Sequence, residues 1–225
     1  MSTDTKKGGS FLLRRYSGSA RLNHWTTAIT FVLLMLSGMA LFNPSFFFLS
    51  ALFGGGENMR WIHPWLGVVL TVSFFGLFFR FAAANLPEKG DAKWLVSVRA
   101  ILTGHEEYLP EIGRYNAGQK VMFWMQGAMI PILLLTGLIL WDQGRGFLET
   151  ALGLHFSIEF QRWATLAHSI VAIGTILMWV LHVYAAIWVR GTISAMTKGT
   201  VTGGWGWRHH RKWLRAEVGS GKQVS

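Results

Sequence analysis

The feature that most constrains this chain is a set of four long segments without any charged residue. A helix needs about 20 apolar residues to cross a hydrocarbon core about 30 Å thick. In lipid the backbone groups must bond one another within the segment, which favours helices. We therefore predict an all-α membrane four-helix bundle, a single integral-membrane domain over residues 1–225. The charge-free segments are residues 22–56, 61–79, 121–141 and 163–189, and the predicted spans are about 24–43, 61–79, 121–141 and 163–189.

The first segment follows a basic stretch and could instead be the apolar region of a cleaved signal peptide. Such a region is about 7–15 residues long, and residues 29–42 are not much longer than that. The predicted helix begins earlier, at His24, whose imidazole is a candidate ligand. We therefore interpret this segment as an uncleaved anchor.

The net charge of +10 could indicate a nucleic-acid partner, but the placement of the charges explains it otherwise. Residues 1–21 hold five Lys or Arg, residues 80–120 hold six and residues 190–225 hold seven, together 18 of the 21 in the chain. All three segments lie on the same side of the four spans, and basic loops mark the cytoplasmic side. We expect both termini to be cytoplasmic, a lipid bilayer around the spans, and no nucleic acid. The basic, Gly-containing tail, residues 203–225, is expected to be a surface segment.

The chain contains no cysteine, so it cannot form disulfides, hold a Cys-ligated iron–sulfur cluster or attach a c-type haem. Any bound metal must depend mainly on the eight histidines. Four of them lie in or at the ends of the predicted spans: His24, His63, His168 and His182. The others are expected to be solvated or to lie at interfaces: His105, His155, His209 and His210.

The four membrane histidines sort into two pairs by depth. His168 and His182 are 14 residues apart on one predicted helix, which is about 21 Å and nearly a whole number of turns. They therefore project from one face, His168 near the outer side and His182 near the inner side. His63 matches the depth of His168, and His24 matches the depth of His182.

Two imidazoles on opposite sides of a porphyrin give a haem iron that passes electrons and has no open position. Two such pairs predict two haem b groups stacked across the bilayer. The alternatives are histidines that hydrogen-bond between helices and a proton relay. A relay usually recruits carboxylates as well, and the four charge-free segments contain none.

Arg21 and Arg60 stand three residues before His24 and His63, respectively. Residues three apart on a helix are neighbours, so each arginine could contact a haem propionate, or could be an ordinary residue of the membrane boundary. Glycines in the spans would admit a flat macrocycle and would equally suit close helix packing. They are Gly38, Gly67, Gly127, Gly137 and Gly174.

Four motifs resemble the gamma subunit of bacterial respiratory formate dehydrogenase, and the resemblance covers nearly the whole chain, from residue 21 to about residue 215. They are Arg21-Leu22-Asn23-His24-Trp25; Arg60-Trp61-Ile62-His63-Pro64; Arg114-Tyr115-Asn116-Ala117-Gly118-Gln119-Lys120 with Phe123-Trp124; and His182-Val183-Tyr184-Ala185-Ala186-Ile187-Trp188 followed by Arg190-Gly191-Thr192.

This resemblance implies a multi-pass di-haem b cytochrome of the bacterial inner membrane that serves anaerobic respiration. Its partners would be a molybdenum- or tungsten-containing alpha subunit, which oxidises formate, and an iron–sulfur beta subunit, which delivers electrons. The chain itself would hold no residue for formate oxidation. His63 and His168 would ligate the outer haem, and His24 and His182 the inner one.

The electron acceptor implied by the resemblance is a quinone, either menaquinone or ubiquinone, near the cytoplasmic side. Asn116 and Gln119 lie at the cytoplasmic start of the third predicted span, and amide groups can hydrogen-bond quinone oxygens. The resemblance adds His182 as a third contact. The alternative for Asn116 is a helix N-cap.

Two other functions remain open from the sequence. The chain could be the cytochrome b of a membrane hydrogenase or thiosulfate reductase, with the same haem chemistry and a different partner. It could also be a haem-free membrane anchor or transporter.

Overall fold

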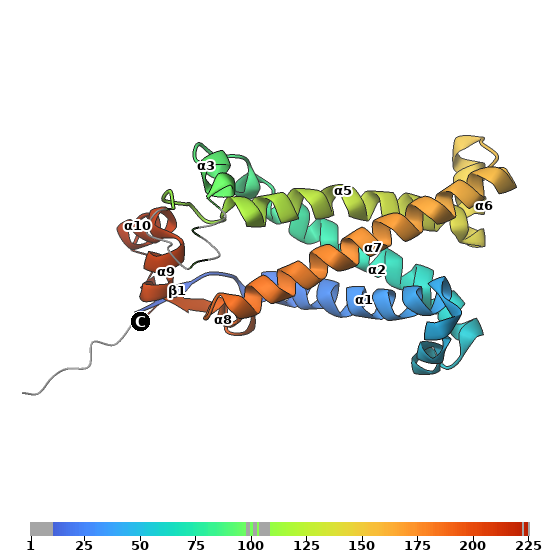
Figure 1. Ribbon diagram of the computed structural model, residues 1–225, viewed down its shortest axis with the longest axis horizontal. Coiled ribbons are helices and arrows are strands. Elements are labelled where there is room, and N and C mark those ends of the chain that lie inside the picture. The colour runs from blue at the N-terminus through green and yellow to red at the C-terminus, as the bar shows by residue number, and fades with distance from the viewer. Residues whose placement is uncertain (1–10, 98–99, 101–102, 104–108, 222, 225) are drawn as a thin grey trace, which may run out of the picture. The chain divides into compact units, whose positions relative to one another are not determined.

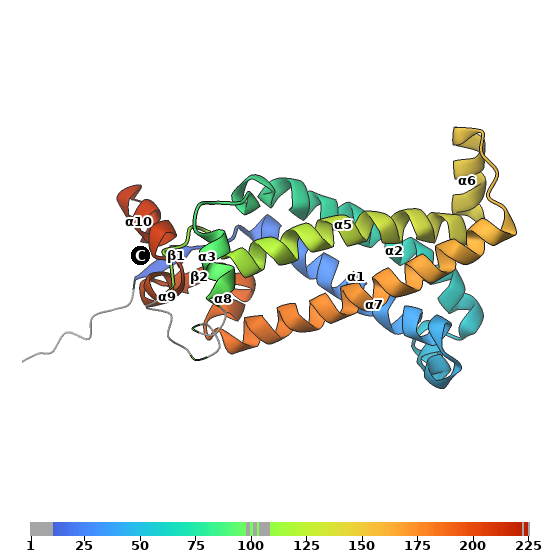
Figure 2. The same cartoon turned by 45° about the horizontal axis from the view of Figure 1, so that its top comes forward.

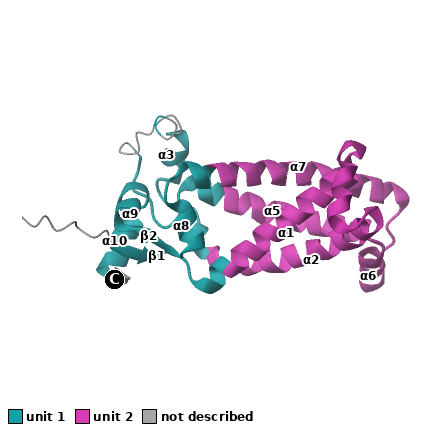
Figure 3. Cartoon of the chain, turned by 90° about the horizontal axis from the view of Figure 1, so that it is seen from below, with its two compact units in different colours: residues 1–21, 83–121, 185–225 teal, residues 22–82, 122–184 magenta. Residues whose placement is uncertain are grey.

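The computed structural model describes residues 11–97, 100, 103, 109–221 and 223–224. The chain divides into two compact units, coloured separately in Figure 3. Unit 1 comprises residues 1–21, 83–121 and 185–225, and unit 2 comprises residues 22–82 and 122–184.

Unit 2 contains nearly all of four long helices, which run alongside one another in the views of Figures 1 and 2. Each is long and apolar enough to cross a membrane, so the predicted all-α membrane bundle is confirmed. Each helix begins before its charge-free segment, because charged residues such as Glu57 and Glu159 take up the first turn. The four are α1 (Gly18–Phe42), α2 (Gly56–Phe81), α5 (Ala117–Leu140) and α7 (Ile158–Trp188).

The surfaces of these helices are apolar and exposed. Only 6–17% of the most apolar window of each helix is buried within the molecule. In water so much exposed apolar surface would drive association, whereas lipid tails are themselves as apolar as leucine. Several large side chains make this surface: Leu22, Ile29, Val72, Phe79, Ile170 and Leu177.

Short helices connect the long ones at the end of unit 2 near His63 and His168. The 3-10 helix η1 (Pro44–Phe53) follows α1, and the Asn43 side chain accepts a hydrogen bond from the Ser45 N–H at its start. Helix α6 (Asp142–Leu152) follows α5. Arg145 on α6 donates to the Gln161 side chain on α7 at 3.2 Å. These bonds fix the connections without placing a charge within a span.

Unit 1 is built around a small antiparallel sheet with strand order β2-β1-β3. In the register of β1 and β2, Leu13 is opposite Val201. The sheet therefore joins the start of the chain to the segment after α7. The strands are β1 (Leu12–Arg14), β2 (Thr200–Thr202) and β3 (Gln223–Val224); the short helices are η2 (Ala83–Asn85), α3 (Asp91–Val96), α8 (Thr192–Thr197), α9 (Gly203–His209) and α10 (Arg211–Gly219).

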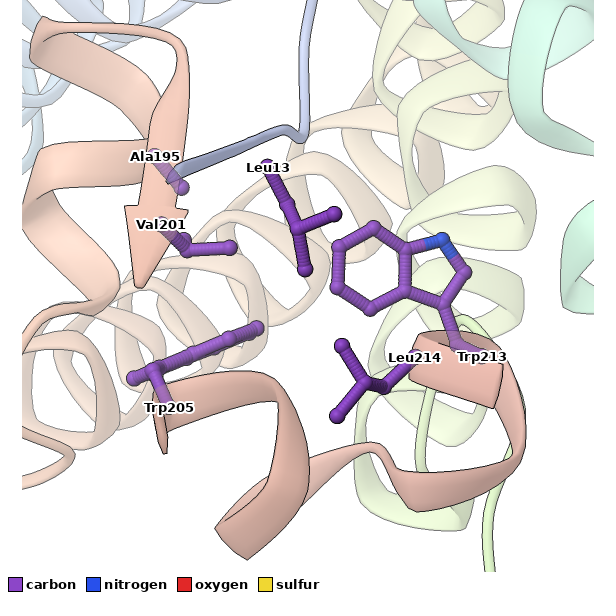
Figure 4. Close-up of a cluster of buried hydrophobic side chains, with 6 residues drawn as sticks. All are labelled: Leu13, Ala195, Val201, Trp205, Trp213 and Leu214. Carbon is purple, nitrogen blue, oxygen red and sulfur yellow. The ribbon is translucent and has the colours of Figure 1, made fainter. Parts of the chain in front are cut away.

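The C-terminal tail is not the surface segment expected from its composition. Its apolar side chains close a buried cluster with Leu13, as Figure 4 shows. The expectation was wrong because Trp205, Trp213 and Leu214 lie in a basic segment, and the chain that completes their cluster includes Leu13, which is far away in the sequence. The cluster consists of Leu13, Ala195, Val201, Trp205, Trp213 and Leu214.

Two arginines pack beside this cluster. The Arg15 guanidinium lies 4.4 Å from the centre of the Trp213 ring and 5.4 Å from that of Trp205. Arg15 donates to the Arg114 carbonyl, and Arg114 donates to the Arg15 carbonyl at 2.6 Å. These reciprocal bonds and cation–π contacts attach the segment before α5 to the sheet.

His210 contradicts the expectation that it is solvated, because it is only 2% exposed. Its Nδ1 hydrogen-bonds the Gly113 carbonyl at 3.0 Å, and its ring lies 4.8 Å from that of Trp205. Burial, with the nearby Arg15 charge, lowers the pKa of His210 to about 3. His155 is exposed as expected, His209 is half-buried, and His105 lies outside the described residues.

We expect acid to destabilise unit 1 through His210. Between about pH 6.5 and pH 3 the unfolded chain protonates this imidazole and the folded chain does not. The free energy of unfolding should therefore fall by up to about 1.4 kcal/mol for each pH unit below about 6.5. Tryptophan fluorescence during urea titration in detergent, at pH 7 and pH 5, measures the effect.

The matched variants for this test are His210→Gln, which keeps a donor for the Gly113 carbonyl but does not titrate, and His209→Gln on the half-buried neighbour. His210→Gln should lose this part of the pH dependence, and His209→Gln should keep it. An unchanged pH dependence in His210→Gln would contradict the assignment.

Candidate functional site

The four histidines predicted as ligands lie within unit 2 and approach each other in two pairs. The outer pair consists of His63 on α2 and His168 on α7, with ring centroids 6.5 Å apart. The inner pair consists of His24 on α1 and His182 on α7, with centroids 6.3 Å apart. These are the pairs expected from matched depth. Helix α7 contributes one imidazole to each.

The separations fit one metal ion between each pair of rings. An imidazole nitrogen lies about 2 Å from its metal and about 1.1 Å from its own ring centre, so two imidazoles on opposite sides of one metal have centroids about 6.3 Å apart. Stacked rings lie closer, as Phe78 and Phe123 do at 4.8 Å, whereas rings in edge contact reach the same distance, as His210 and Trp213 do at 6.5 Å. Both histidine pairs leave room for one metal ion between the rings.

In the outer pair, the ring of His63 is fixed by a hydroxyl group. Ser37 Oγ on α1 lies 2.7 Å from His63 Nδ1 and donates its own hydrogen to the Leu33 carbonyl at 2.9 Å. Because a hydroxyl has only one hydrogen, its oxygen accepts from the imidazole N–H. His63 then carries its proton on Nδ1, and the lone pair on Nε2 is available to a metal.

His168 has the same arrangement with a hydroxyl from a different helix. Thr136 Oγ1 on α5 lies 2.8 Å from His168 Nδ1 and donates to the Ile132 carbonyl at 2.6 Å. Metal-binding histidines usually donate their second N–H to a partner of this kind. Both outer imidazoles thus have Nε2 available to bind a metal.

The inner pair differs. His24 Nδ1 is buried and has no hydrogen-bond partner among the described residues. The His24 ring makes an edge contact with Trp25, at 5.5 Å between centroids. No hydroxyl of the described chain bonds either inner imidazole.

Two of the glycines noted in the sequence lie against the outer histidines. A Cβ on Gly38 would lie 3.5 Å from His63 Cε1, and a Cβ on Gly137 would lie 3.4 Å from His168 Cε1. A Cβ at either position would make an ordinary van der Waals contact with the imidazole. In contrast, Gly127 serves helix packing, because a Cβ there would lie 2.5 Å from the Phe78 ring.

The two arginines proposed for propionates have different surroundings. Arg60 is exposed, one turn before His63 on α2. Arg21 belongs to unit 1, where its guanidinium donates to the Thr197 carbonyl. Arg21 also lines a basic cavity of about 160 Å³ with Arg14 and Lys198. Neither arginine forms an ion pair with a carboxylate in the described chain.

Asn116 and Gln119 form a reciprocal cap at the start of α5. The Gln119 N–H donates to Asn116 Oδ1 at 2.8 Å, and the Asn116 N–H donates to Gln119 Oε1 at 3.0 Å. This is a capping box, so both amide oxygens hold the helix end, as the alternative for Asn116 anticipated. The amide NH₂ groups are the donors that would remain for a ligand.

Ion pairs hold this end of α5 within unit 1. Lys120 is 5% exposed and contacts Asp91 at 3.0 Å and Glu88 at 3.5 Å. Glu88 also binds Lys212 of α10 at 2.8 Å, a hydrogen bond that lowers its pKa. The capping box therefore lies on a fixed backbone.

Ser37 and Thr136 were not identified from the sequence as functional residues. The signal that could have found them is a tripeptide near the end of two predicted spans, Leu36-Ser37-Gly38 and Leu135-Thr136-Gly137. In each tripeptide the hydroxyl bonds an outer imidazole and the glycine lies against the same ring. A small polar residue beside glycine in an apolar helix is typical of a helix–helix packing interface, so the two tripeptides did not indicate a function.

Comparison with known proteins finds several cytochrome subunits of bacterial formate dehydrogenases among the relatives of this chain. The formate dehydrogenase cytochrome b556(fdo) subunit of Escherichia coli K12 is 39% identical over 89% of this chain and 91% of its own length. The nitrate-inducible formate dehydrogenase cytochrome b556(Fdn) subunit of the same organism is 36% identical over 87% of each chain. The formate dehydrogenase cytochrome b556 subunit of Haemophilus influenzae is 36% identical over 91% of this chain and 83% of its own length.

The family model of prokaryotic cytochrome b561 matches residues 15–199, a range that includes all four paired histidines. With four apolar helices and these bacterial relatives, the chain is a multi-pass protein of the bacterial inner membrane. Cytochromes of this family carry haem b, in agreement with the imidazole pairs described above. The chain belongs to the prokaryotic cytochrome b561 family.

Proposed function

We propose that this chain is the membrane-anchoring, di-haem cytochrome b subunit of a formate dehydrogenase. The observation that carries the haem assignment is the pair of imidazole contacts, 6.3 and 6.5 Å between centroids, each with the spacing of two ligands on one iron. When bound, a haem supplies reversible one-electron chemistry at its iron. The relatives, which are cytochrome subunits of formate dehydrogenases, support the choice of complex.

We assign separate roles in this function to the histidines and the arginines. His63 and His168 would hold one haem, and His24 and His182 the other. Because two imidazoles would hold each iron, it would have no open site for a substrate, and the chain would transfer electrons without binding formate. Arg60 and Arg21 are proposed contacts for the haem propionates.

The proposed electron path begins at an iron–sulfur beta subunit, which receives electrons from a molybdenum- or tungsten-containing alpha subunit. It passes the outer pair and then the inner pair, and ends at a quinone on the cytoplasmic side. Asn116 and Gln119 are proposed to donate hydrogen bonds to a quinone oxygen, and the resemblance adds His182. The capping box supports this only in part, since it leaves the NH₂ groups as the donors.

The test of the proposed function is the haem content and the partner of the purified protein. We expect two haems b per chain by the pyridine haemochrome spectrum, and co-purification with a molybdopterin subunit from membranes. A haem-free protein would favour an anchor or transporter instead. Co-purification with a nickel–iron subunit, or with a thiosulfate reductase, would overturn the formate dehydrogenase assignment.

Turnover of the complex should separate charge across the membrane. Electrons would move from the outer to the inner pair, and quinone would take up protons on the cytoplasmic side. Each charge moved is worth about 2.3 kcal/mol per 100 mV. Proteoliposomes given formate and quinone should therefore build a potential, negative on the cytoplasmic side, measured with a voltage-sensitive dye. Quinone reduction without a potential would contradict the direction.

A change at Asn116 should affect quinone without affecting haem. Asn116→Ser keeps a side-chain oxygen for the Gln119 N–H, so the cap survives, but it lacks the amide donors. Both haem spectra should be normal, and reoxidation of the reduced haems by quinone should slow roughly three- to tenfold, the value of about one hydrogen bond. Stopped-flow absorbance measures this rate.

Asn116→Ala is the matched control, because it removes the cap and the donors together. It should show the same slow reoxidation and, in addition, a loss of stability of about 0.5–2 kcal/mol. Normal reoxidation in Asn116→Ser would show that Asn116 acts only as a helix cap.

A further inference from the structure

We propose that Ser37 and Thr136 are positioning residues that hold the outer haem at a lower reduction potential than the inner haem. The inference rests on the proposed function, since it needs a haem at each histidine pair. Ser37 and Thr136 contact the proposed ligands, His63 and His168, and would not contact the iron itself.

The hydroxyl groups determine which nitrogen of each outer imidazole carries the proton. Each hydroxyl already donates to a carbonyl of its own helix, Ser37 to Leu33 and Thr136 to Ile132. The remaining contact, to Nδ1, is therefore an N–H donating to the hydroxyl oxygen. This fixes the same tautomer on both outer histidines and directs both Nε2 lone pairs to the site between the rings.

These hydrogen bonds would change the reduction potential of an iron held by the two imidazoles. A ligand whose second N–H donates a hydrogen bond gains electron density and becomes more basic. More basic ligands stabilise the ferric state over the ferrous state, because the ferric iron carries one more positive charge. Two such ligands act on the outer site, and each lowers its reduction potential.

In the described part of the chain, the inner pair lacks the hydroxyl partners of the outer pair. His24 Nδ1 is buried without a hydrogen-bond partner among the described residues, and no described hydroxyl bonds His182. Neither inner ligand therefore has a hydroxyl partner within the described chain, in contrast to both outer ligands. Hydrogen bonding to the ligands is one of the main means by which a protein sets a haem potential, so the two sites differ even though all four ligands are imidazoles.

Burial protects the hydrogen bond between Ser37 and His63 from water. Ser37 is 0% exposed, so water has no access to replace its oxygen at His63. Gly38 and Gly137, beside the two hydroxyls, leave space for the imidazole rings. The consequence for function is a downhill step for electrons from the outer site to the inner site.

The experiment is an optical redox titration of the purified, haem-loaded protein carrying Ser37→Ala, Thr136→Val or both. Thr136→Val preserves the shape of the side chain and removes only the hydroxyl. Each single variant should shift the outer haem to a more positive potential. At a fixed ambient potential, its ratio of reduced to oxidised iron should rise roughly two- to tenfold, the effect of one hydrogen bond.

The outer haem is identified as the one absent from His63→Ala. Its electron paramagnetic resonance signal should also move in Ser37→Ala and Thr136→Val, because the ligand field changes with ligand basicity. The inner haem should keep its potential and its signal. In the double variant the two shifts should add, since the hydroxyls act on different ligands.

Two control variants separate this effect from a general loss of polarity or packing. Thr136→Ser keeps the hydroxyl and should keep the wild-type potential. Thr71→Val removes a hydroxyl on α2 that bonds only its own helix, at the Gly67 carbonyl, and should leave both haems unchanged.

The outcomes distinguish this inference from the proposed function. Wild-type protein without haem would overturn the proposed function, and the inference with it. Two haems in every variant with unchanged potentials would overturn the inference alone. Loss of the outer haem from Ser37→Ala, with no potential shift in Thr136→Val, would show that the hydroxyls serve folding only.

Discussion

Replacing His63 or His168 with alanine is expected to remove one and the same haem. Each of these histidines would supply one of the two iron ligands at the outer pair, where the rings are 6.5 Å apart. One imidazole holds a b-type haem much less tightly than two, because no covalent bond attaches the macrocycle. The haem-to-protein ratio should therefore fall from about two to about one. The pyridine haemochrome spectrum measures this ratio.

Which haem is missing tests the pairing more strictly than the haem content alone. His63→Ala and His168→Ala should lack the same component in a redox titration, and both should retain the other component. His155→Ala changes an exposed histidine outside the pairs and should keep both haems. Retention of two haems in every paired-histidine variant would show that the assignment is wrong.

Replacing His24 or His182 with alanine should interrupt electron transfer instead of merely slowing it. The inner pair would be the only relay between the outer site and a cytoplasmic quinone. His168 and His182 are 14 residues apart, which corresponds to about 21 Å along α7, and electron transfer slows steeply with distance. After reduction by dithionite, the remaining outer haem should stay reduced when quinone is added, as followed by stopped-flow absorbance.

The comparison for this second result is the outer-site variant. His63→Ala would keep the inner haem, which should still be reoxidised by quinone at close to the wild-type rate. If the outer haem of His24→Ala is reoxidised as fast as in wild-type protein, quinone has access to the outer site and the proposed path is wrong.

The four spans could be predicted from the sequence because a membrane imposes one simple rule, a long run without charge. The pairs of histidines followed for a related reason. A straight helix fixes the depth and the face of each residue, so His168 and His182 on α7 determine where their partners must lie. The start of each helix was less predictable, because charged residues such as Glu57 are helical outside the apolar run.

The fold of unit 1 could not be predicted from the sequence. Leu13 and Val201 meet only when β1 pairs with β2, a contact between residues far apart in the chain. Trp205 and Trp213 lie in a basic tail, and such a tail is normally solvated. His210 was misjudged for the same reason, since its partner, Gly113, belongs to another segment.

The contribution of α7 to both pairs has a consequence for how the protein is made. Helices α1 and α2 leave the ribosome early, each carrying a single paired histidine, and α5 carries none. Both partners, His168 and His182, arrive with α7, the last of the long helices in chain order. Neither site is complete until this helix has been synthesised and inserted. If the pairs hold the haems as proposed, haem loading would depend on a finished membrane domain, and a chain truncated before α7 would acquire neither haem.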